Sequence, residues 1–180
     1  MSENGIQCLL KGLLYNNGLD HLDLSCCSQM NDQCMADLAN LLRSKSCTIK
    51  TLNLTSTRIS NTGAQQLASA LKSNCTVQTL HLSRTRIAKE GVTALLNMLR
   101  NQNTTLRSIT RSYESTVSGG CCWDEIDCLL AQNRAGRALL QNVETPASMA
   151  PLLLARANKE KDPHVMFSLL RQVPHVWTQA

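Results

Sequence analysis

Two consecutive stretches of sequence with the same internal pattern decide the fold. Residues 49–76 read IKTLNLTSTRISNTGAQQLASALKSNCT, and residues 77–105 read VQTLHLSRTRIAKEGVTALLNMLRNQNTT. Residues 19–48, LDHLDLSCCSQMNDQCMADLANLLRSKSCT, follow the same frame with single-residue insertions. In the order given, the three copies are 28, 29 and 30 residues long. Self-similarity at such a period is typical of an array of stacked units.

Each copy carries a strand pattern followed by a helix pattern. Leu52 and Leu54 alternate with polar residues, which is the spacing of a strand with one buried face. Ala64, Leu67 and Leu71 then recur at helical spacing. A single unit cannot bury its own leucines, so it must stack on its neighbours. The repeat therefore predicts an α/β fold built from stacked strand–helix units.

These residues resemble a known family. LNLTSTRISNTGAQQLASALKSN (52–74) and LHLSRTRIAKEGVTALLNMLR (80–100) resemble leucine-rich repeats of the ribonuclease-inhibitor type, which also occur in NOD-like receptors and in the Ran GTPase-activating protein. The resemblance implies a curved solenoid with parallel strands on the concave face and helices on the convex face. It identifies no ligand, because fold does not fix function. CWDEIDCLLAQNRAGRALLQ (122–141) is similar to the tail of some algal leucine-rich-repeat proteins.

Some positions depart from the family pattern. Thr57, Thr85 and Cys27 follow the strands, where many leucine-rich repeats have asparagine. We expect these side chains to turn inward and to satisfy polar groups of the loops. Cys34 stands where the later repeats have glycine.

The frame divides the chain into a solenoid and a helical tail. Arg111 stands where earlier repeats have a strand leucine, and burying a charge is costly, so the fourth strand is expected to be short and terminal. We expect the tail to cover the last repeat; the alternative is a separate partner-binding module. The predicted parts are a solenoid over 1–112 (partial repeat 5–18, full repeats 19–48, 49–76 and 77–105, terminal strand 106–112), a loop over 113–122 and a helical C-terminal cap over 123–180.

The frame also extends before the first full copy, so the chain begins partway through a repeat. Either the predicted helix from Gly5 to Tyr15 is a minimal cap, or the chain is a fragment of a longer protein. We favour the fragment.

Charge and cysteine usage limit the function classes. The net charge of +5 is spread along the chain without a dense basic block, which disfavours nucleic-acid binding. No apolar run approaches the ~20 residues that would span a bilayer.

Nine cysteines, an odd number, together with a start that does not resemble a signal peptide, favour free thiols and a cytoplasmic location. A disulfide between Cys47 and Cys75, which share a frame position, is the less favoured alternative.

The outward side chains of the strands, together with residues of the following loops, are the candidate binding surface. Arginine and tyrosine are enriched at binding hot spots, and both occur toward one end of this surface. The alternatives are a solvated polar face that binds nothing, or binding along the convex helices or the tail. The predicted partner-binding residues are Thr51, Asn53, Thr79, His81, Arg84, Arg86 and Tyr113.

The sequence contains no catalytic, metal-ligand or cofactor motif. It therefore predicts a non-catalytic protein–protein interaction module, which acts as a monomer or as part of a larger chain. A GTPase-activating regulator that uses Arg84 or Arg86 is one alternative. A ribonuclease inhibitor is another, but it would need an acidic concave face to complement a basic enzyme.

Overall fold

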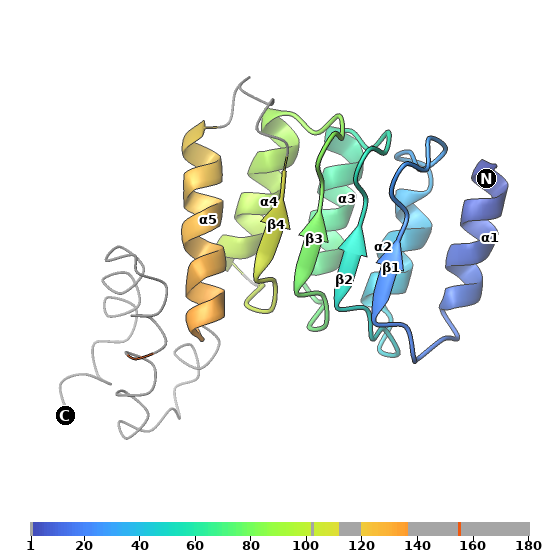
Figure 1. The fold of residues 1–180 in the computed structure, drawn as a ribbon, viewed down its shortest axis with the longest axis horizontal. Coiled ribbons are helices and arrows are strands. Elements are labelled where there is room, and N and C mark those ends of the chain that lie inside the picture. Colours follow the sequence, from blue (N-terminus) through green and yellow to red (C-terminus); the bar gives the residue numbers. More distant parts are fainter. Residues whose placement is uncertain (1, 102, 112–119, 137–154, 156–180) are drawn as a thin grey trace.

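The computed structural model describes residues 2–101, 103–111, 120–136 and 155. Figure 1 shows the strands side by side in one layer, with the helices in a second layer and with α1 and α5 at its two ends. In chain order, the described elements are α1 (Glu3–Leu13), β1 (His21–Asp23), α2 (Met35–Arg43), β2 (Thr51–Asn53), α3 (Asn61–Leu71), β3 (Thr79–His81), α4 (Lys89–Asn101), β4 (Ser108–Thr110) and α5 (Gly120–Ala135).

The strands form one parallel sheet in the order β1-β2-β3-β4. Its register pairs Leu22 with Leu52, Leu52 with Leu80, and Leu80 with Ile109. All four side chains are buried, whereas their neighbours along each strand are more exposed. The predicted α/β solenoid of stacked strand–helix units is confirmed.

An apolar layer fills the space between the strands and the helices. Leu67 and Leu71 of α3 are fully buried in it, and α1 contributes Ile6 and Leu10. Among the described residues the fully buried side chains include no aromatic ring, and only 3% of the chain is aromatic, although Trp123 packs against the layer from a partly buried position. Burial of one leucine side chain stabilises the fold by about 2 kcal/mol. In a stacked array this burial depends on the adjacent repeat as well as on the leucine's own repeat.

Side chains of one repeat cap the helix of the next. Asp32 accepts a hydrogen bond from the backbone N–H of Ser60, at 2.8 Å, and a second bond from the hydroxyl of Ser60. One repeat later, Asn61 Oδ1 accepts from the N–H groups of Ala88, at 2.7 Å, and Gly91, at 3.2 Å. The first N–H groups of a helix have no partner within the helix, so these contacts satisfy them and join the repeats.

This capping explains the glycine near the start of α4. A Cβ added to Gly91 would lie 2.7 Å from Ile87 Cγ2, 2.9 Å from Asn61 Oδ1 and 3.0 Å from Ala64 Cβ. The capping oxygen approaches the backbone so closely that no side chain fits. Gly63 is more crowded still, because an added Cβ would lie even closer to the capping oxygen of Asp32 and 2.8 Å from Ile59 Cγ2.

We therefore predict that Gly91→Ala destabilises the protein by about 1–3 kcal/mol, because the overpacking outweighs the higher helix propensity of alanine. Equilibrium denaturation in urea measures the change. Gly12→Ala is the matched control, because a Cβ there meets nothing within 4 Å. Equal losses at the two positions would contradict this explanation.

Buried asparagines join the opposite ends of the helices. Asn74 Nδ2 donates to the carbonyl of Leu42, at 2.8 Å, and Asn103 Nδ2 donates to that of Leu71, at 2.7 Å. Asn103 Oδ1 also accepts from the backbone N–H of Leu106, at 2.8 Å. Each asparagine thus binds a carbonyl at the end of the helix of the preceding repeat and a backbone N–H just before the strand that follows it in the chain. Both are at most 5% exposed.

Asn103→Ala leaves these buried backbone groups without partners, and we expect it to cost about 2–4 kcal/mol of unfolding free energy. Asn97→Ala, at an exposed position of α4, provides the comparison and should change stability by less than about 0.5 kcal/mol. A loss at Asn103 no larger than at Asn97 would show that the buried amide is not needed.

Helix α5 takes the place of a further repeat helix beside α4 (Figure 1). It begins at Gly120, so the loop predicted to reach residue 122 ends earlier. Asn133 Nδ2 donates to the carbonyls of Leu106, at 2.8 Å, and Asn103, at 3.2 Å, and so continues the row of buried asparagines. The repeat frame therefore resumes in α5 after its interruption at Arg111. Apart from residues 123–136 and 155, the helical C-terminal cap predicted over 123–180 lies outside the described residues.

The charge at the strand-leucine position is accommodated by α5. Arg111 lies over the ring of Trp123, 4.6 Å from its centroid, and 3.2 Å from the carboxylate of Asp127. Its side chain remains 26% exposed, so it is not fully removed from water. The expected fourth strand is present and has the same three-residue length as the others.

Candidate functional site

A row of polar side chains crosses the concave face of the sheet. The register places Asn53 beside Asp23 on one side and beside His81 on the other, with Thr110 next to His81. Asn53 Nδ2 donates to Asp23 Oδ2, at 3.0 Å, and His81 Nδ1 lies 2.7 Å from Thr110 Oγ1. The four side chains are therefore held in two bonded pairs, and all four are exposed or partly exposed.

Asp23 is fixed further by the loop that follows it. The carboxylate accepts a 2.8 Å hydrogen bond from the backbone N–H of Ser25. Hydrogen bonds from Ser25 and Asn53, with a smaller effect of the charge of His81, hold the pKa of Asp23 below its ordinary value. Asn53 repeats the arrangement, because its Oδ1 accepts from the N–H of Thr55 at 3.1 Å.

A lowered pKa predicts a pH dependence. The ionised carboxylate stabilises the fold above the unfolded-state pKa, near ~3.9, and this contribution is lost as the pH falls through the lower, folded-state pKa. Asp23 is exposed, so Asp23→Asn should cost less than about 1 kcal/mol at neutral pH. The difference in stability between wild type and variant should shrink below about pH 4. A difference that grows in acid would contradict the assignment.

The lateral hydrogen bonds continue beyond the strands into the loops. Ser56 donates its backbone N–H to Ser83 O, and Cys26 donates to Thr55 O, both at 2.8 Å. Cys26, Ser56 and Arg84 share one frame position and have φ of 57°, 56° and 55°. A left-handed backbone is uncommon for such residues, and its recurrence shows that the repeat, not the side chain, fixes the loop.

Thr57 turns inward as predicted and is 4% exposed. Its hydroxyl donates to the carbonyl of Leu54 at 2.7 Å, and Thr85 donates to Leu82 at 2.9 Å. The partners belong to the same repeat rather than to a neighbouring loop. Cys27, at the same position, is half-buried.

The structure brings most of the predicted partner-binding residues to one face. Thr51 and Thr79 pair in register, as do Asn53 and His81. Arg84 and Arg86 lie in the loop after β3, and both are exposed. Tyr113 lies outside the described residues. The same alternation turns Asp23 and Thr110 outward, and Arg58 follows its loop threonine as Arg86 does, but these three residues were not among the predicted partner-binding residues.

The side chains on this face offer hydrogen-bonding and charged groups. No group of three or more His, Cys, Asp or Glu side chains that could hold a metal ion occurs within the described ranges. None of the described helices is long and apolar enough to cross a membrane.

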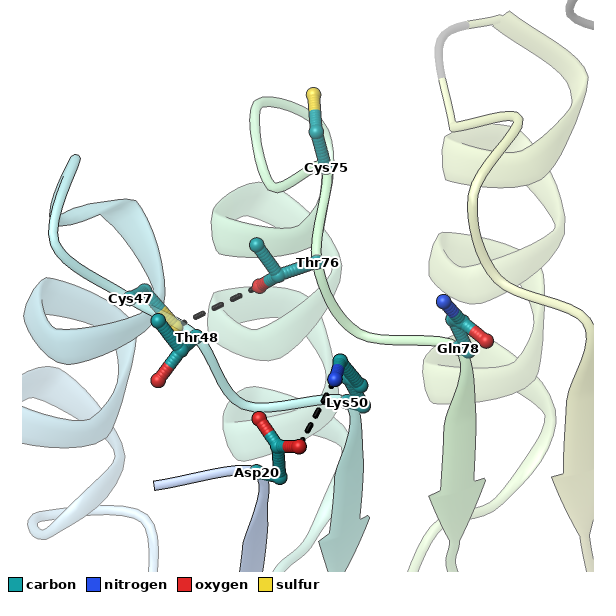
Figure 2. A pocket seen from close by; sticks show the side chains of 7 residues that line it. All are labelled: Asp20, Cys47, Thr48, Lys50, Cys75, Thr76 and Gln78. Atoms are coloured by element: carbon teal, nitrogen blue, oxygen red, sulfur yellow. Dashed lines mark hydrogen bonds and ion pairs between the residues drawn. The ribbon is translucent and has the colours of Figure 1, made fainter. Parts of the chain in front are cut away.

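A shallow pocket of about 290 Å³ lies at the other end of the strands (Figure 2). Lys50 forms a 2.8 Å ion pair with Asp20 in it, and the hydrogen bond from Lys50 lowers the pKa of that carboxyl. Thr76 donates its hydroxyl to Cys47 Sγ at 3.6 Å, while Cys75 points away from Cys47 in Figure 2. Both thiols are free, so the disulfide considered from the sequence is not formed.

Comparisons with known proteins agree with this architecture. A family model described as "Leucine Rich repeat" matches residues 45–68 and 73–96, which include β2, β3 and most of α3 and α4. The search of curated proteins gave no match. Among solved structures, "Leiomodin-1 Actin-Binding Site 2 (ABS2)" is similar, with a TM-score of 0.61 and 20% identity over 88% of this chain and 90% of that chain. At this identity the likeness concerns the fold alone. The parallel register, the repeat matches and the structural neighbour together identify the fold of this chain as a leucine-rich-repeat solenoid.

Proposed function

We propose that this chain is a non-catalytic protein–protein interaction module that presents its concave face to a partner protein. The observation that carries the proposal is the polar row from Asp23 through Asn53 and His81 to Thr110. These side chains are already held by hydrogen bonds. A partner that binds them does not have to order them first, and such preorganisation favours affinity.

The backbone beneath this row also supports the proposal. Leu54 N–H donates to His81 O, and Leu82 N–H donates to Thr110 O, both at 2.9 Å. Sites built on regular elements hold their geometry more precisely than sites on unsupported loops. Leiomodin-1 actin-binding site 2 shares the fold, and its name describes a segment that binds a protein.

The finer features of the proposal come from the sequence. They are a ribonuclease-inhibitor-like repeat subtype, a cytoplasmic location and the binding residues Thr51, Asn53, Thr79, His81, Arg84, Arg86 and Tyr113. Nucleic acid and membranes are not expected partners. The GTPase-activating alternative requires Arg84 or Arg86 to act on the nucleotide held by a GTPase. Arg84→Ala or Arg86→Ala should then slow GTP hydrolysis, whereas for a chain that only binds its partner these variants should leave hydrolysis unchanged.

Site-specific photocrosslinking in cells tests the binding face. A photoreactive residue at Asn53 should give a discrete protein adduct, whereas the same residue at Gln65, exposed on α3, should not. His81→Ala, next to Asn53, should reduce the yield of the adduct at Asn53. Adducts formed only from Gln65 would assign binding to the convex helices and would overturn the proposal.

A further inference from the structure

We infer that the segment of the partner recognised here is an acidic peptide in extended conformation, which crosses the loops after β2 and β3 and pairs with Arg58 and Arg86. This inference rests on the proposed function and specifies the chemistry of the partner. It also extends the binding surface from the strands onto the adjoining loops.

The two arginines hold equivalent positions in adjacent loops. Arg58 donates its backbone N–H to Met30 O, at 3.0 Å, and Arg86 donates to Ile59 O, at 2.9 Å. Each arginine directly follows the inward-turned threonine of its loop, Thr57 or Thr85. The backbone therefore fixes the two side chains one repeat apart, and both are exposed.

Arg84 adds a third guanidinium to the same pair of loops. It is exposed, and it lies in the loop after β3 with a left-handed backbone, at a φ of 55°. The residues at its frame position in the two preceding repeats, Cys26 and Ser56, carry no charge. The cationic cluster is therefore concentrated over β2 and β3 rather than spread along the solenoid.

The acidic side chains that follow Arg58 and Arg86 most closely in the repeat pattern already have other hydrogen-bond partners. Asp32 accepts two hydrogen bonds from Ser60, and Glu90 accepts one from Asn61 at 2.6 Å. The ion pairs among the described residues involve neither Arg58 nor Arg86. Both guanidinium groups thus retain their capacity for charge-assisted, bidentate hydrogen bonds to carboxylates.

An extended peptide matches the spacing of these groups. Adjacent parallel strands lie ~4.8 Å apart, and the spacing widens toward the helix layer because helices pack at ~8–10 Å. In an extended chain, alternate side chains lie on one side and are separated by ~6.6 Å. Acidic residues at alternate positions can therefore each meet one arginine while the peptide runs across the loops.

A peptide fits this surface better than single-stranded nucleic acid. Binding of single strands without sequence preference uses aromatic side chains on which successive bases stack. The described part of these two loops, residues 54–60 and 82–88, contains no aromatic residue. Arginines with no aromatic side chain beside them can bind the carboxylates of a peptide but provide no surface on which bases could stack.

The test uses the full chain and a fluorescein-labelled peptide in which glutamate alternates with serine, with binding followed by fluorescence anisotropy. The wild type should bind with an affinity that falls as salt is raised. Arg58→Ala/Arg86→Ala should weaken binding about tenfold or more, and Arg58→Lys/Arg86→Lys should weaken it less, since charge remains but the bidentate fork is lost.

Lys45→Ala/Lys72→Ala is the matched control, because it removes the same charge from exposed positions at the opposite end of the helices. It should leave affinity within about twofold. Circular dichroism establishes that each variant is folded. Equal losses in the two double variants, or equal binding of a glutamine-for-glutamate peptide, would overturn the inference.

A single-stranded oligonucleotide of equal charge forms the second arm. Tighter binding of the oligonucleotide through the same arginines would overturn the choice of a peptide. The photocrosslink at Asn53 is read in parallel. If the adduct forms undiminished in Arg58→Ala/Arg86→Ala, the acidic-peptide inference fails, but the proposed function of the concave face stands. If no adduct forms in the wild type, the proposed function itself fails.

Discussion

The structure depends on the fact that the leucines of one strand–helix unit can be buried only by the next unit. Leu52 pairs in register with Leu22 on one side and Leu80 on the other, and the three form one continuous apolar line. A slip of one residue would turn these side chains to the solvent face, so the hydrophobic pattern also sets the register. The polar row on the opposite face follows from the same register.

Hydrogen bonds between repeats add specificity to this stacking. Asp32 and Asn61 cap the start of the next helix, while Asn74, Asn103 and Asn133 donate to the carbonyls of Leu42, Leu71 and Asn103, each in the repeat before them. Buried backbone groups without partners are costly, so each contact favours one way of stacking. The concave face is positioned by these bonds even though none of its side chains takes part in them.

The sequence predicted the strand leucines, the helices of the repeats and the outward strand residues, because periodicity of two and of 3.6 residues reports directly on which face is buried. It did not reveal the role of Asn74 and Asn103, whose Asn-x-Thr triplets look like glycosylation motifs when read locally. Their partners lie one repeat away, and a pattern within one repeat cannot show them. Asn133 was missed for the same reason, since the frame is interrupted at Arg111 and resumes only in α5.

The candidate site was predictable in outline but not in its bonding. Alternation identified Thr51, Asn53, Thr79 and His81, but the pairing of Asn53 with Asp23 requires the register of neighbouring strands. The left-handed backbone at Arg84 carries no sequence signal, because glycine, the usual marker of such a backbone, is absent from all three equivalent positions.

Native-state hydrogen exchange at the amides that directly follow β2 and β3 tests the stacking of the repeats most directly. The N–H groups of Leu54 and Leu82 donate across repeats to His81 and Thr110. If stacking holds the solenoid together, both should exchange only through one shared, large-scale opening and show the same free energy. Exchange of either amide at the rate of an unstructured peptide, while the helices remain protected, would contradict the account.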